Sequence, residues 1–143
     1  MNLQTDITLS DQAEERLRKR LLAKASSFDL LALLKALRLI GYEPDDIFFE
    51  NAVDEAATRS LVRFVRFEDR PIHRVVVGVN MGMMGPNGPL PSYFQQFAEN
   101  LPDREPFDLM IGFFDHLSLK NLFASLYPDF YSRYYDSWEG MRK

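Results

Sequence analysis

The chain of 143 residues contains no cysteine and only two histidines. The lack of cysteine excludes disulfide bonds, thiolate metal sites and cysteine nucleophiles. No apolar run reaches the length that a membrane-spanning helix needs, and residues 1–6 lack the basic and apolar segments of a secretory signal. These absences favour a cytoplasmic protein with no direct membrane insertion.

Positive charge is also in short supply. The 17 Lys and Arg residues face 21 Asp and Glu residues, which gives a net charge of −4. The basic footprint of a nucleic-acid-binding protein is therefore missing, and we expect no nucleic-acid partner. The length predicts a single domain over 1–143, with 1–10 as a loose N-terminal arm.

Aromatic residues are what the chain has in excess: they make up 13% of it, and twelve of them are phenylalanine. Such an excess indicates a large core, an interface, or both. The spacing of hydrophobic residues along the sequence predicts an α+β fold, with N-terminal helices, a small antiparallel sheet and C-terminal helices. No internal repeat or linker interrupts this order.

Helices are predicted for the N-terminal part of the chain. A charge-rich helix is expected over 11–24, and a leucine-rich helix follows it up to Ile40. Ser26 or Ser27 is expected to cap the second helix, with Asp29 helping in its first turn, and Gly41 to end it.

Strands are predicted over 47–50, 61–67 and 72–81, with 51–60 left undecided between a loop and a helical turn. The last two strands form a hairpin spanning about 61–81. The third is expected to place alternating side chains on one face, namely Val75, Val77, Val79 and Met81.

A glycine- and proline-rich segment follows the third strand. It predicts a rigid corner between strand and helix, because proline fixes φ, and asparagine and glycine tolerate positive φ. Pro91 suits the first turn of the helix that starts there. The residues of this structural corner are Gly82, Gly85, Pro86, Asn87, Gly88, Pro89 and Pro91.

Two further helices are predicted after the corner. The first is short and amphipathic, and the second begins at Pro106 and is broken at Pro128. The apolar face of the second is expected to comprise Phe107, Met110, Phe113 or Phe114, Leu117 and Phe123.

Aromatic side chains recur at helical spacing near the end of the chain. They could pack into the core of the domain, or they could form a partner-binding surface, because tyrosine and tryptophan are favoured anchors of interfaces. The sequence leaves these alternatives about even. The residues are Tyr127, Phe130, Tyr131, Tyr134, Tyr135 and Trp138.

Catalytic chemistry finds little support in the sequence. Asp115 and His116 are adjacent, so on a helix they point about 100° apart and cannot form the pair that a catalytic triad needs. We interpret His116 as a partly buried, hydrogen-bonding helix residue and His73 as a surface residue. No metal-ligand spacing appears, and the Walker lysine of a phosphate loop is missing after Gly82. We expect no catalytic residue, metal, cofactor or small-molecule substrate.

Several segments together resemble a known family. Gly-Pro-Asn-Gly-Pro-Leu-Pro at 85–91 resembles the corner of TssG, the wedge protein of the type VI secretion baseplate. Ser27-Phe28-Asp29-Leu30-Leu31 is similar to the family's N-terminal helix, and Ile47-Phe48-Phe49-Glu50-Asn51 to its first strand. Phe113-Phe114-Asp115-His116-Leu117 is similar to its Phe-(Asp/Asn)-His helix. The resemblance runs from about Phe28 to Trp138.

The resemblance implies a non-enzymatic scaffold in the baseplate of a bacterial contractile injection system, at the inner face of the cell envelope. It implies protein partners like TssF, and also like TssK. The family continues with a second half beyond the position of Lys143, so the TssF-like partner is the more direct implication. Two alternatives stay open: a stand-alone adaptor that reuses the fold for another partner, and a hydrolase that uses His116.

Overall fold

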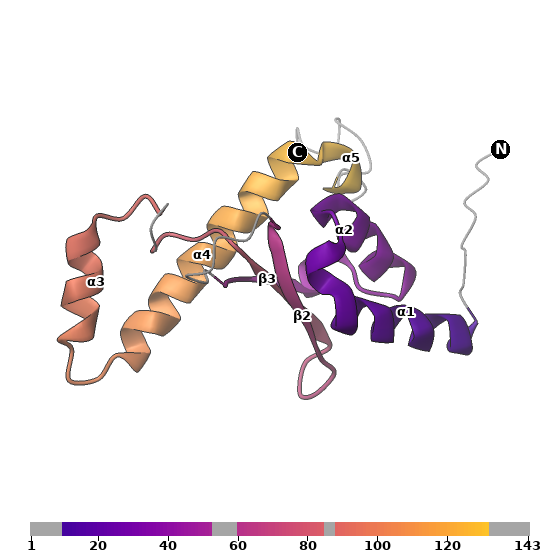
Figure 1. Cartoon of the computed structure of the whole chain (residues 1–143), viewed down its shortest axis with the longest axis horizontal. Helices are drawn as coiled ribbons and strands as arrows, with labels where there is room; N and C mark the ends of the chain where they lie inside the picture. The colour runs from indigo at the N-terminus through magenta and orange to yellow at the C-terminus, as the bar shows by residue number, and fades with distance from the viewer. Residues whose placement is uncertain (1–9, 53–59, 85–87, 132–143) are drawn as a thin grey trace, which may run out of the picture. The chain divides into compact units, whose positions relative to one another are not determined.

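The computed structural model describes residues 10–52, 60–84 and 88–131 (Figure 1). Within these residues it confirms an α+β fold, with helices at both ends of the chain and a small sheet between them in sequence. The predicted arm at 1–10 lies outside the described residues except for Ser10. The helices and strands are α1 (Asp11–Lys24), α2 (Leu30–Leu39), β1 (Ile47–Asn51), β2 (Val62–Glu68), β3 (Arg74–Val79), α3 (Ser92–Glu99), α4 (Glu105–Leu126) and α5 (Pro128–Tyr131).

The described residues divide into two compact units. Unit 1 comprises residues 10–48 and 60–78, and unit 2 comprises residues 49–52, 79–84 and 88–131. The boundary falls within β1 and near the end of β3, so both units take residues from the sheet. The single domain expected from the length stays a prediction.

The helix α2 supplies much of the core of unit 1. Its N-cap is Asp29, whose side chain accepts a hydrogen bond from the Leu31 N–H at 3.2 Å. The predicted serine cap is wrong, because Ser26 and Ser27 belong to a separate 3-10 turn. Gly41 ends the helix with a φ of 92°, which only glycine adopts readily. The buried leucines of α2 are Leu30, Leu33, Leu34 and Leu37.

The sheet has the strand order β1-β3-β2. The predicted hairpin of β2 and β3 is confirmed, but the sheet is mixed rather than purely antiparallel. The Ala52 N–H, just after β1, donates to the Val79 carbonyl at the end of β3 (2.8 Å), so these two strands run in the same direction.

The central strand β3 is buried on both faces. Sequence alternation placed Val75, Val77 and Val79 on one inward face, but Val76 is buried as well. A central strand that is buried on both faces typically has a continuous run of apolar residues in its sequence. Met81 lies beyond the end of β3 and is 39% exposed, so the prediction that it shares a strand face with these valines is wrong.

Unit 2 is built on α4. Proline at the start of α4 and Pro128 at the start of α5 are both confirmed as helix boundaries. Pro91 is the N-cap of α3 rather than part of its first turn. The ring of Phe49 packs edge-on against Phe123, with centroids 4.9 Å apart. The buried apolar residues of this unit include Phe49, Ala98, Leu119, Phe123 and Phe130.

Candidate functional site

The corner is a place where backbone segments approach closely. A Cβ added to Gly82 would collide with the Asn51 side chain, and one added to Gly88 would collide with the Met83 carbonyl. The Leu90 N–H donates to that same carbonyl at 3.0 Å, which closes the loop across its base. Glycine is therefore required here for space. Of the predicted corner residues, Gly85, Pro86 and Asn87 lie outside the described residues, whereas Gly82, Gly88, Pro89 and Pro91 lie within them.

Three polar side chains join the corner and β1 to the helix α4. Asp115 is 4% exposed, and its Oδ1 accepts a hydrogen bond from the Met83 N–H at 2.6 Å. His116 Nδ1 accepts from the Phe49 N–H at 3.0 Å. Asn51 Nδ2 donates to the Met84 carbonyl at 3.0 Å. We call Asn51, Asp115 and His116 the polar clamp.

Burial shifts the pKa values of the two titratable members of the clamp in opposite directions. It raises the pKa of Asp115, and the hydrogen bonds from the Met83 N–H and the Asn51 side chain oppose that rise. It lowers the pKa of His116, and the positive charge of Lys120 lowers it further. His116 is therefore neutral at pH 7 with Nδ1 as the acceptor, which places its proton on Nε2.

The two histidines lie as the sequence predicted. His116 is a half-buried helix residue held by a hydrogen bond, and its partner is the backbone of β1 rather than Asp115. The adjacent residues Asp115 and His116 thus bind two different segments of the chain, the corner and β1. His73 is half-exposed and stacks on Tyr42, with ring centroids 4.3 Å apart. Among the described residues, no group of three or more acidic or histidine side chains could hold a metal ion.

Unit 1 contains a second polar cluster, which the sequence did not indicate. The fully buried Tyr42 donates its hydroxyl to Asp69 Oδ1 at 2.9 Å and accepts from Arg18 Nη2 at 3.1 Å. Burial, with the hydrogen bond to Asp69, raises the pKa of Tyr42 to about 12. The guanidinium of Arg18 also lies 4.9 Å from the ring centre of Phe67. A neutral tyrosine between these ions holds α1 against the hairpin turn, which is a structural role.

The helix α4 buries a different face from the one predicted. Its buried residues are Asp115, Leu119 and Phe123, which repeat at four-residue spacing and include one member of the clamp, Asp115. Phe123 is the one member of the predicted face that is buried, and Phe107 is half-buried. The remaining members of the predicted face are exposed: Met110, Phe113, Phe114 and Leu117. The prediction failed because apolar residues lie on every side of α4, so periodicity alone did not select a face.

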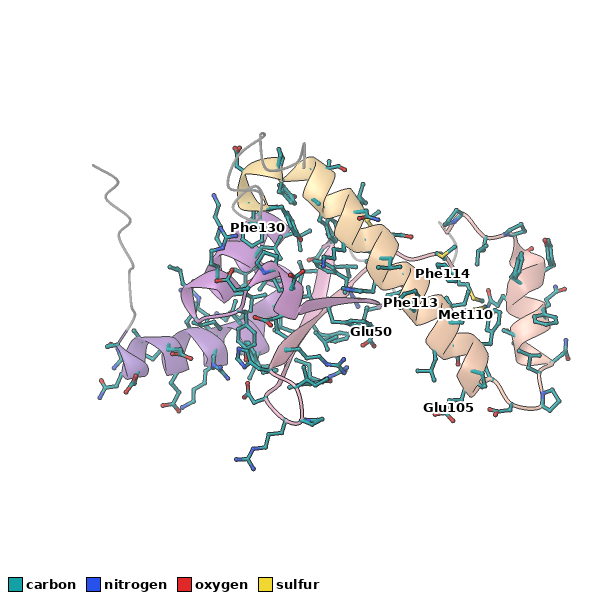
Figure 2. All side chains as sticks on the ribbon, turned by 180° about the vertical axis from the view of Figure 1, so that it is seen from behind. Glu50, Glu105, Met110, Phe113, Phe114 and Phe130 are labelled. Atoms are coloured by element: carbon teal, nitrogen blue, oxygen red, sulfur yellow. The ribbon has the colours of Figure 1, made fainter. Side chains whose placement is uncertain are left out.

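The uncovered side of α4 forms a broad apolar stripe. At about 100° per residue, its five members fall within an arc of about 140°. They are Leu109 (68% exposed), Met110 (48%), Phe113 (56%), Phe114 (45%) and Leu117 (38%). Figure 2 labels three of them, Met110, Phe113 and Phe114, along the helix that starts at Glu105.

The short helix α3 adds to this stripe. A short connection joins the end of α3 to the start of α4 (Figure 1), and near it the rings of Phe97 and Phe107 meet edge-on with centroids 6.0 Å apart. Tyr93 and Phe97 remain 61% and 54% exposed, so the predicted amphipathic helix keeps much of its apolar face uncovered. We call these two residues and the five of α4 the apolar surface.

Acidic residues gather at one end of the apolar surface. Residues 99–108 contain four acidic side chains and one basic one, a net charge of −3, and all five are exposed. Arg104 is bonded to Asp108 at 3.0 and 3.1 Å. We call the acidic residues of this segment the acidic rim: Glu99, Asp103, Glu105 and Asp108.

The C-terminal aromatic residues divide between core and undescribed chain. Phe130 is 4% exposed, which agrees with the alternative that it packs into the core. Tyr127 and Tyr131 are half-buried. Tyr134, Tyr135 and Trp138 lie outside the described residues, and their role stays a prediction.

Comparisons of the chain with protein-family models, with curated proteins and with solved structures found no match. Among the described residues, no helix is both long enough and apolar enough to cross a membrane.

Proposed function

We propose that this chain is a non-enzymatic assembly subunit that binds protein partners through the apolar surface of α3 and α4. The observation that carries the proposal is the stripe of five large side chains on α4, each at least 38% exposed. Soluble proteins rarely leave a contiguous patch of such side chains uncovered, and patches of this kind mark interaction sites. Apolar side chains lie on every side of α4, which is typical of a helix that is covered on more than one side.

A more specific proposal follows from the resemblance to TssG. The two motifs that carry it, the glycine-proline corner and the Asp-His pair of α4, are joined by the hydrogen bond from the Met83 N–H to Asp115. This contact supports a single rigid device that fixes a helix relative to a sheet edge within unit 2. The chain would then serve as a wedge subunit of a type VI secretion baseplate. Its partners would be a TssF-like and a TssK-like protein, at the cytoplasmic face of a bacterial envelope.

The test is a tagged pull-down from the native host, with mass spectrometry of the recovered proteins. Wild-type chain is compared with Phe113→Ser and with the matched control Leu22→Ser. Leu22 is a suitable control because it is an apolar residue of α1 with a similar exposure, 54% against 56%.

We expect TssF-like and TssK-like proteins to be recovered in a fixed ratio with wild type and Leu22→Ser, and to be lost with Phe113→Ser. Recovery that is equal for all three chains would contradict docking through the apolar surface. Recovery of an unrelated partner that depends on Phe113 would keep the docking role and replace the baseplate proposal with the stand-alone adaptor.

A further inference from the structure

The apolar surface has a charge of definite sign beside it, and this restricts what can cover it. The inference rests on the proposed docking role of that surface. The described part of unit 2 contains seven acidic residues and two basic ones, a net charge of −5. The described part of unit 1 contains nine acidic and eleven basic residues, a net charge of +2. The acidic character is therefore concentrated in the unit that has the uncovered helices.

The acidic rim lies directly beside the apolar stripe. Glu105 precedes Leu109 by four residues, so the carboxylate and the most exposed leucine of the stripe are neighbours on α4. Glu99 is the last residue of α3, and Asp103 lies in the connection to α4. A partner that covers the stripe thus brings its own flanking residues next to these carboxylates.

Two possible occupants fit this charge poorly. A second copy that paired through the same surface would bring its own acidic rim toward this one, and like charges across an interface are unfavourable. The cytoplasmic leaflet of a membrane carries negative charge and attracts basic segments, not acidic ones.

We infer that the apolar surface takes a basic amphipathic helix from a partner protein. In this mode leucine-like side chains at i, i+3, i+4 and i+7 pack on the stripe of α4. Lysine or arginine residues beside them meet Glu99, Asp103 and Glu105. The apolar contacts supply the affinity, whereas the charges select the partner and speed its association.

Fluorescence anisotropy with a labelled peptide tests this chemistry. The probe is a helical peptide in which leucine recurs every three or four residues and lysine fills the other positions. The matched peptide has glutamate in place of lysine. Both are titrated with the whole chain, with Phe113→Ser, with the rim variant Asp103→Asn/Glu105→Gln, and with Leu22→Ser.

We expect the lysine peptide to bind and the glutamate peptide not to. Phe113→Ser should weaken binding of the lysine peptide at least about tenfold. The rim variant should weaken it about threefold, mainly through slower association, and the loss should shrink as salt rises. Leu22→Ser should bind like wild type.

Several results would overturn the inference. Equal binding of the two peptides would contradict a basic helix as the partner. Binding of the lysine peptide that is unchanged by Phe113→Ser would contradict it as well. The same holds if the chain dimerises at pH 7.5 through Phe113, or if it binds zwitterionic lipid vesicles through Phe113. A partner recovered in the pull-down can also be cross-linked to the apolar surface to identify the segment that binds. If its capture depends on Phe113 but that segment is acidic or neutral, the charge assignment is refuted and the docking role stands.

Discussion

At the scale of single residues, glycine at position 88 is required for space. Its missing side chain allows the Met83 carbonyl to approach the backbone and accept from the Leu90 N–H. We expect Gly88→Val to lower the free energy of unfolding by about 1–3 kcal/mol, because backbone must shift to admit the side chain. Urea denaturation followed by circular dichroism measures this change.

Gly112 provides the matched control for that substitution. It lies within α4, and nothing is found within 4 Å of the position that a Cβ would take. Gly112→Ala should therefore be neutral or should stabilise the chain by about 0.5–1 kcal/mol, since alanine is the better helix former. If Gly88→Val were as harmless as Gly112→Ala, the corner would not depend on this close approach.

His116 makes stability depend on pH in a definite direction. Its pKa in the folded chain is lowered from the ordinary value of 6.5. The unfolded chain therefore binds more protons on this group than the folded one when the pH falls below that value. Stability is lost as the pH falls from about 6.5 through the lowered pKa, and it is fully present above that window.

The substitution His116→Asn removes this titration and keeps an acceptor near the Nδ1 position for the Phe49 N–H. We expect urea midpoints of wild type to fall from pH 7.5 to 5.5, and those of the variant to fall less. The raised pKa of Asp115 acts in the opposite sense, because stability from that group is lost as the pH rises through its folded pKa. Both chains contain Asp115, so the difference between their slopes reports His116, and equal slopes for wild type and His116→Asn would contradict the histidine effect.

At the scale of helices and strands, the sequence predicted what local chemistry determines. Helix ends were predictable at Gly41 and Pro128, because positive φ and the missing proline N–H act on their own neighbourhood. The N-cap of α2 was assigned to the wrong residue, since Ser26, Ser27 and Asp29 are all good caps and the 3-10 turn decides among them.

Features that depend on tertiary neighbours were not predictable in the same way. Alternation in β3 could not reveal that the strand is central, which buries Val76 together with its neighbours. On α4, the stripe with Phe113 is more apolar than the buried face, which begins with Asp115. That face is selected by the bonds of Asp115 to Met83 and of His116 to Phe49, and their partners are more than 30 residues away in sequence. The sequence showed that Asp115 and His116 are adjacent polar residues, but it did not indicate which backbone groups they bind.

At the scale of the whole molecule, net charge and the apolar surface act against each other. The chain carries −4 at pH 7, and its isoelectric point is about 5.2. Repulsion between acidic units keeps uncovered apolar surfaces apart at neutral pH, and it fades as the net charge approaches zero. The balance between monomer and aggregate should therefore change between these two pH values.

We expect light scattering to show a monomer at pH 7.5 and concentration-dependent association near pH 5.2, while circular dichroism still reports folded chain. Phe113→Ser should reduce the association, because it removes an apolar side chain that is 56% exposed from the stripe on α4. Leu22→Ser removes a side chain of similar exposure from α1 and should leave the association unchanged. A similar reduction in both variants would mean that general surface hydrophobicity, rather than the apolar surface, drives association. Association confined to pH values at which the dichroism signal is lost would assign it to the unfolded chain, and the loss of His116 stability on acidification would then be the first cause to test.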